Sequence, residues 1–261
     1  MGTPSLSILP GELVVIVFQQ LDSSATLLAL ARTSSHFWSI WESEYFYITQ
    51  ALFPRLIICF DDAEQLADAQ QRRLTCLNLP QEIALDRVKR IFLNARSVQV
   101  MCDHFTSSVM TKGFVSEKKV PYLTSDERTR FTHAFYNVWT LVCISKSSKT
   151  REESRDFLAT KDLREMYRLG EIGLWLRKLF YSQINHRPAL TSAAEKFPSG
   201  VDEYLRLSAW DWTRSELHRA WARRMFNSAG TCHTRKPPAA PNGMFAIFDM
   251  WQNYVDLIPV E

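Results

Sequence analysis

The sequence contains little glycine. Eight of its 261 residues are glycine, about 3% of the chain against a usual value near 7%. Glycine supplies the positive φ angles of tight strand turns and the close backbone approach of phosphate-binding loops. Both features are therefore disfavoured. The composition predicts an all-α protein.

Cysteine is present, but without an organised pattern. The five cysteines are scattered and odd in number, and none of them forms a C-x-x-C pair. This pattern predicts neither a disulfide framework nor a zinc site of recognised spacing, and it fits a reducing compartment best. The five are Cys59, Cys76, Cys102, Cys143 and Cys232.

Long hydrophobic runs and a strong excess of one charge are also missing. The longest apolar run is 13–18, and the first basic residue is Arg32. A membrane-spanning helix needs about 20 apolar residues, and a secretory signal begins with basic residues. The sequence therefore predicts no membrane partner and a cytoplasmic or nuclear location. The net charge of +3 is too small to attract nucleic acid over the whole surface, so nucleic acid is not expected as a partner.

The first fifty residues have the apolar spacing of short, packed helices. Pro10 suits the start of a helix, because the N–H that proline lacks has no partner there. Leu13, Val17 and Leu21 follow at i+4 spacing on one helix face. The Asp-Ser-Ser segment 22–24 is typical N-cap sequence before a second apolar stripe. Three or four short helices are predicted.

The same segment carries a motif. It reads Leu9-Pro10-x-Glu12-Leu13, then Val17-Phe18, Leu21-Asp22, Leu27-Leu28-x-Leu30 and Phe37. This order of residues resembles the F-box, the helical module by which substrate receptors dock on SCF-type ubiquitin ligases. Residues 27–41 further resemble a variant common in filamentous-fungal F-box proteins, in which a Thr-Ser pair and an aromatic replace the usual Cys and Trp.

The resemblance implies two partners, a Skp-family adaptor subunit and, through it, a cullin ligase. It also implies which residues contact the Skp-family subunit. These are Leu9, Pro10, Glu12, Leu13, Val17, Phe18, Leu21, Leu27 and Leu30. Residues 123–139 resemble a block found downstream of the F-box in fungal F-box-like proteins, which supports the family and says nothing about a substrate.

The rest of the chain predicts further helices without a recognisable repeat. We expect an F-box-like domain at 5–53 and a helical, partner-binding domain at 54–261. Thr124 and Glu127 form a capping box, followed by apolar residues at helical spacing. Other helices are expected near 62–74, 81–105, 160–183, 201–208, 213–225 and 244–257, and loops at 113–123, 145–155 and 228–243.

No familiar catalytic or metal motif is present, so the sequence predicts no catalytic residue, no metal site and no cofactor. The pairs Cys102-x-His104 and Cys232-His233 lack zinc-ligand spacing. His133 is expected to be a helix-surface histidine or a half-buried, hydrogen-bonded one rather than a catalytic base. Arg219 and its basic neighbours share a predicted helix with Trp221, a pattern more typical of a solvated face than of a nucleic-acid site.

These expectations together favour a non-enzymatic adaptor. The first unit would bind a Skp-family subunit and the remainder would position a protein substrate, so that other subunits transfer ubiquitin by proximity. A helical interaction protein whose F-box-like unit is not coupled to a ligase is the alternative.

Overall fold

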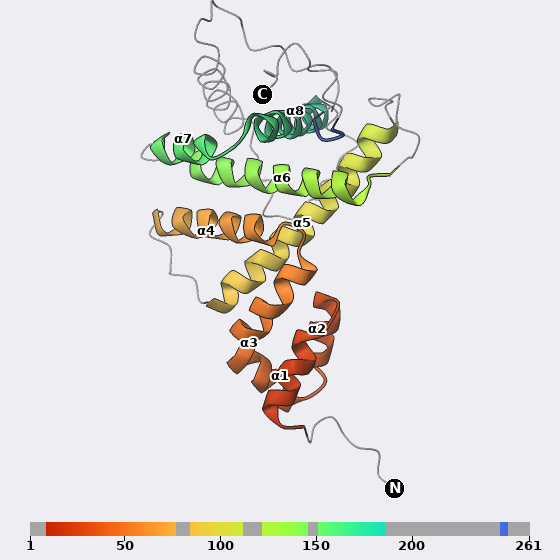
Figure 1. Ribbon diagram of the computed structural model, residues 1–261, viewed down its shortest axis with the longest axis vertical. Helices are drawn as coiled ribbons and strands as arrows, with labels where there is room; N and C mark the ends of the chain where they lie inside the picture. The colour runs from red at the N-terminus through yellow and green to blue at the C-terminus, as the bar shows by residue number, and fades with distance from the viewer. Residues whose placement is uncertain (1–8, 77–83, 112–121, 146–150, 186–245, 250–261) are drawn as a thin grey trace, which may run out of the picture.

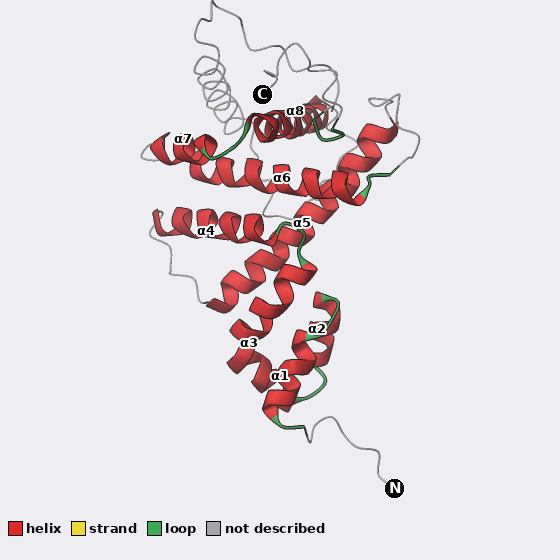
Figure 2. Cartoon of the chain, viewed as in Figure 1, coloured by secondary structure: helices red, strands yellow, loops and turns green. Residues whose placement is uncertain are grey.

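The structure is a computed structural model that describes residues 9–76, 84–111, 122–145, 151–185 and 246–249. Helices account for 84% of these residues, and none of them lies in a strand, which confirms the all-α prediction (Figure 2). The helices are α1 (Gly11–Gln19), α2 (Ser24–Ala31), α3 (Ser35–Leu56), α4 (Phe60–Cys76), α5 (Ala84–Thr111), α6 (Ser125–Ser145), α7 (Arg151–Ala159) and α8 (Leu163–Asn185).

The helices form two groups that α3 and α5 connect (Figure 1). At one end, α1 and α2 pack on α3. At the other, α4 packs on α6 and α6 packs on α8, which makes a stack with α6 in the middle. The helix α5 crosses this stack and contacts both α4 and α6.

The helices α2 and α3 both begin at a serine N-cap, and the first of these lies in the Asp-Ser-Ser segment that predicts one. The Ser23 hydroxyl accepts a hydrogen bond from the Thr26 N–H at 3.0 Å, and the Ser34 hydroxyl accepts one from the Phe37 N–H at 3.2 Å. Each bond satisfies one of the N–H groups that a helix start leaves without a partner. The Thr-Ser-Ser interruption at 33–35 is thus the boundary between α2 and α3.

Phe18 anchors the packing of this end. Its side chain is fully buried, with ring centroids 6.4 Å from Phe37 and 6.2 Å from Trp41 on α3. Rings at such distances and tilts interact favourably beyond the area that they bury. The core continues along α3 through Ile48 and Leu52, both 0% exposed.

The predicted boundary between 53 and 54 falls inside α3. The helix includes Pro54 in its last turn and ends at Leu56, where the Ile57 N–H still bonds the Phe53 carbonyl at 2.9 Å. Phe53 is 2% exposed, and its ring lies 4.4 Å from Phe92 on α5. The N-terminal helices therefore share buried surface with the body of the molecule.

The capping box at the start of α6 is confirmed. The Glu127 N–H donates to the Thr124 hydroxyl at 3.3 Å, and the Glu127 carboxylate accepts from the Thr124 N–H at 2.7 Å. The predicted apolar face of this helix is buried, with Phe131 and Phe135 both 0% exposed. The central helix of the stack is thus the one with the clearest start signal in the sequence.

One loop prediction is wrong in part. Residues 151–155 belong to α7 rather than to a loop at 145–155. The helix is polar in sequence, but Ser154 and Leu158, four residues apart, are both 0% exposed. Arg, Glu, Leu and Ala are good helix formers, and packing of this one face on α6 stabilises the short helix.

Several other predictions lie wholly or largely outside the described residues. Among them are the helices near 201–208 and 213–225, the loop at 228–243, and most of the loop at 113–123 and of the helix at 244–257. The described part of that last segment, 246–249, is a turn. Within the part of the chain that the structure covers, no helix combines the length and apolar character that crossing a membrane requires.

Candidate functional site

The helix α1 has apolar residues on two faces, and only one of them is covered. Val14 and Phe18, four residues apart, point into the core and are at most 1% exposed. Leu13, Ile16 and Val17 lie outside that face with exposed fractions of 47%, 51% and 38%. The nine-residue helix therefore presents a row of three large apolar side chains to solvent, which we call the α1 face. Clustered exposed apolar residues of this kind mark interaction surfaces.

The structure divides the nine residues that the sequence predicts as partner contacts. Pro10 and Glu12 are exposed, as are Leu13 and Val17 of the α1 face. Three others are partly buried and pack against the core, namely Leu9, Leu21 and Leu30. The remaining two, Phe18 and Leu27, are 0% exposed core residues.

Phe18 and Leu27 are therefore covered by the chain itself and belong to its core. In a motif of short helices, the residues that build the core and those that meet a partner alternate along one helix. Sequence order alone does not separate the two sets. The residues predicted as partner contacts also omit Ile16. Its exposed position follows from the i+3 spacing to Leu13.

The C-terminal end of α1 contacts α3 at a position where α3 carries two exposed aromatic residues. Gln19 at the end of α1 donates a hydrogen bond from Nε2 to the Tyr47 carbonyl at 3.3 Å, which ties the two helices together. The Tyr47 and Phe46 side chains are 61% and 57% exposed, with ring centroids 5.8 Å apart in a T-shaped arrangement. Large exposed aromatics are the side chains that contribute most at protein interfaces.

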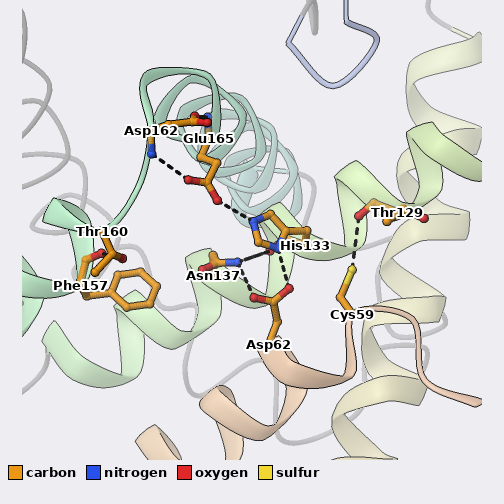
Figure 3. Close-up of polar contacts among 9 residues, drawn as sticks. All are labelled: Cys59, Asp62, Thr129, His133, Asn137, Phe157, Thr160, Asp162 and Glu165. Atoms are coloured by element: carbon orange, nitrogen blue, oxygen red, sulfur yellow. Dashed lines mark hydrogen bonds and ion pairs between the residues drawn. The ribbon is translucent and has the colours of Figure 1, made fainter. Parts of the chain in front are cut away.

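A second candidate site is a polar cluster inside the helical stack (Figure 3). His133, on α6, lies between two carboxylates from the neighbouring helices. Its Nδ1 is 2.6 Å from Asp62 Oδ2 on α4, and its Nε2 is 3.0 Å from Glu165 Oε1 on α8. Of the two environments expected for His133, the structure shows the half-buried, hydrogen-bonded one. One imidazole thus connects the three stacked helices.

Each carboxylate of the cluster is held by a helix start. Asp62 lies in the first turn of α4, where the helix dipole favours negative charge. Glu165 forms a capping box with Asp162, in which each backbone N–H donates to the other residue's carboxylate at 2.7 Å. Asn137 donates from Nδ2 to the second oxygen of Asp62 at 3.1 Å. These bonds fix the carboxylates independently of His133.

The electrostatics of the cluster favour an imidazolium between two carboxylates. The hydrogen bond with Asp62 raises the pKa of His133 against the opposing effect of burial. Burial also opposes ionisation of Glu165, but the hydrogen bonds from the Asp162 backbone and from His133 outweigh it and lower the pKa of this carboxyl. Both shifts stabilise the charged pair.

A thiol completes the cluster. The ligand atoms of Cys59, Asp62 and His133 all lie within 4.8 Å of one another. Burial, together with the negative charges of Asp62 and Asp61, raises the pKa of the Cys59 thiol to about 12. Sequence reasoning missed this group, because Cys59 and His133 are far apart in the chain and no local spacing joins them.

The cysteine and histidine pairs singled out from the sequence do not converge. Cys102 is 0% exposed in the core, whereas His104 is exposed, with its ring 6.1 Å from Trp175. Burial raises the pKa of the Cys102 thiol to about 11, as expected for an inert core cysteine. Cys232 and His233 lie outside the described residues, as do Arg219 and Trp221.

Comparison with known proteins identified no relative. The chain matches no family model, no curated protein and no solved structure.

Proposed function

We propose that the protein is a substrate-receptor subunit of an SCF-type ubiquitin ligase, which binds a Skp-family subunit through its N-terminal helices. The observation that carries this proposal is the α1 face. The F-box-like motif implies contacts from the segment Leu9 to Val17, and this segment displays three large apolar side chains without a partner. A soluble chain gains most from such a row when a second protein covers it.

The size of the α1 face fits an anchor within a larger interface. Leu13, Ile16 and Val17 follow one another at helical spacing, so one groove on a partner could receive all three. Pro10 and Glu12 stand exposed at the start of the same helix and extend the contact. Interfaces typically combine a few apolar anchors with a polar rim.

The helical stack would then hold the protein substrate. In such an arrangement the chain needs no reactive side chain of its own, because bringing two reactants together supplies the rate enhancement. The close packing of α4, α6 and α8 gives a rigid base from which a substrate could be positioned. The chemistry of ubiquitin transfer would belong to the other subunits.

A helical interaction protein that is not coupled to a ligase is the alternative, and one observation favours it. Phe53 on α3 packs on Phe60 of α4 and Phe92 of α5, with centroids 5.9 Å and 4.4 Å away. Through Phe53, the N-terminal group of helices shares its core with α4 and α5. In this second function their role would be structural.

Co-purification of the full chain from cells distinguishes the two functions. The double variant Leu13→Ala, Val17→Ala should reduce capture of a Skp-family subunit and a cullin by at least about tenfold, since each lost anchor costs on the order of 1–2 kcal/mol. Leu93→Ala is the matched control, because Leu93 is a 63% exposed leucine on α5. If the double variant captures both subunits as well as the wild type does, the ligase function is wrong.

A further inference from the structure

Three different metal-binding side chains meet where α4 begins beside α6. Cys59 precedes α4, Asp62 lies in its first turn, and His133 lies on α6. Their ligand atoms are within 4.8 Å of one another, and none of the three residues is fully buried. Thiol, carboxylate and imidazole in one accessible cluster are an unusual combination. In the metal-free protein the Cys59 thiol donates a hydrogen bond to the Thr129 carbonyl at 3.7 Å, which a bound ion would replace (Figure 3).

We propose that Cys59 Sγ, Asp62 Oδ2 and His133 Nδ1 form a binding site for a divalent transition-metal ion of the zinc type. Zinc accepts all three donor types, whereas magnesium and calcium prefer oxygen ligands only. Three protein ligands leave one tetrahedral position for water or for a ligand from a partner.

The distances allow the ion to enter with small movements. Ligand atoms around a tetrahedral zinc are roughly 3.3–3.6 Å apart. The Nδ1 to Oδ2 distance of 2.6 Å has to widen by about 1 Å, which rotation of one carboxylate can provide. The three ligand atoms lie within 4.8 Å of one another, so the pairs that are farther apart than a tetrahedral edge have to close around the ion.

The ion takes the place of protons. At 2.6 Å a proton lies between His133 Nδ1 and Asp62 Oδ2, and the thiol carries another. Binding to the cluster with a protonated imidazole releases one proton from Nδ1 and one from Sγ to solvent. The bound state holds one thiolate, one carboxylate and one neutral imidazole, so the two negative charges balance the dication.

The surroundings orient the donors as an outer shell does in known metal sites. Glu165 accepts from the other imidazole nitrogen, Nε2, which fixes Nδ1 as the free donor. Asn137 holds Oδ1 of Asp62, which leaves Oδ2 for the metal. Asp61 adds negative charge beside the thiol. The positive charge of Lys161 acts in the other direction and lowers the pKa of His133.

Cys59 also has an uncommon backbone conformation at the start of α4. Cys59 has φ of 57°, in the left-handed region that glycine occupies most easily. Among the described residues only Asp249 shares this property. Strained backbone of this kind clusters at functional sites. A glycine here would relieve the strain but would supply no thiol.

Titration of the full chain with Co²⁺ tests the proposal. We expect one equivalent to bind and to produce a tetrahedral d–d spectrum with a thiolate-to-metal charge-transfer band, and Zn²⁺ to displace it. Cys59→Ser should abolish the charge-transfer band. Cys102→Ala, which removes a cysteine outside the cluster, should leave the band intact.

A second variant separates metal binding from folding. Glu165→Gln keeps all three ligands and should weaken Zn²⁺ binding by about 10- to 100-fold, as loss of an outer-shell carboxylate does. Circular dichroism in the presence of a chelator verifies that each variant is folded. If folded wild-type protein binds no Co²⁺, or if folded Cys59→Ser binds it with an unchanged spectrum, the site does not exist. Capture of a Skp-family subunit is a separate measurement that either result leaves unaffected.

Discussion

The two ends of the molecule bury their apolar residues to different degrees. In the helical stack, α6 is surrounded, and from Ala134 to Ile144 every side chain is buried. In the N-terminal helices, α1 covers one apolar face and leaves Leu13, Ile16 and Val17 exposed. Among the described residues, the middle helix of the stack is therefore covered, whereas one apolar face of α1 is not. Substitutions in the stack should affect stability, and substitutions on the α1 face should affect binding.

The polar contacts show the same difference. His133 connects α4, α6 and α8 through two carboxylates. Glu171 on α8 is 2% exposed, and its carboxylate accepts from the Ala246 and Ile247 N–H groups at 2.7 Å and 3.0 Å. Between α1 and α3 the contacts are a long Gln19 bond and a bond from exposed Arg55. Buried polar networks fix one arrangement of the stack.

The largest effect should come from the core of α6. Phe135 is 0% exposed, and its ring lies 5.7 Å from Phe131 and 6.2 Å from Trp139. Phe135→Ala should lower the free energy of unfolding by about 3–5 kcal/mol, because a cavity remains. Urea denaturation measures this. Leu13→Ala is the comparison and should change stability by at most about 0.5 kcal/mol; equal losses would refute the division between core and surface.

The next effect should come from the buried carboxylate of α8. Glu171→Ala leaves the Ala246 and Ile247 N–H groups without their acceptor, and each buried unsatisfied N–H costs about 1–3 kcal/mol. Hydrogen exchange of these two amides should accelerate more than exchange in α6. If the two amides remain as protected as in the wild type, Glu171 does not hold this turn.

A smaller effect is expected at the start of α6. Thr124→Ala removes the hydroxyl that accepts the Glu127 N–H at 3.3 Å. Loss of one N-cap bond should cost about 1 kcal/mol. Thermal or urea unfolding measures the change. Thr124→Ser retains the hydroxyl and should behave as the wild type; if serine is as destabilising as alanine, the cap bond is not the cause.

The smallest effect should be a pH dependence of metal-free protein. Because the pKa of His133 is raised in the folded state, protonation of this residue stabilises the fold. The whole contribution is present below about pH 6.5, the ordinary histidine value. It is lost as the pH rises through the folded-state pKa. The lowered pKa of Glu165 contributes stability above its ordinary value, lost as the pH falls. Asp62 and Lys161 are the other charged groups facing the imidazole.

Stability should therefore decline above neutral pH more steeply in the wild type than in His133→Gln, as measured by urea denaturation in the presence of a chelator. Partial exposure of the cluster screens these charges, which is why the effect is small. Parallel stability profiles for the two proteins would show that His133 does not titrate as a link between helices.

Much of the fold follows from local signals in the sequence. The Thr124 and Glu127 pair marks the start of α6, and the Thr-Ser-Ser segment at 33–35 marks a helix boundary, because caps act within a few residues. Local signals did not predict that α3 continues through Pro54, nor that the segment 151–159 forms the helix α7. Packing against other helices outweighs the helix-breaking proline in α3, and in α7 it stabilises a segment that has few apolar residues to reveal a helical pattern.

The residues of the two candidate sites could be predicted from the sequence only in part. The motif indicates α1, but only the structure separates buried Phe18 from exposed Ile16. The cluster at His133 has no sequence signature, since Cys59 and Asp62 reach it through tertiary packing of α4 on α6. One cue was available for Glu165, which follows Asp162 at the spacing of a capping box.

The central claim is that the α1 face binds a Skp-family subunit, and site-specific photo-crosslinking tests it most directly. Ile16, 51% exposed, is replaced by p-benzoylphenylalanine in the full chain, which is then mixed with a purified Skp-family subunit and irradiated. The same replacement at Leu93, an exposed leucine on α5, is the control. We expect a covalent adduct from position 16 and none from position 93. The absence of an adduct at position 16 in folded protein, or equal adducts at both positions, would contradict the claim.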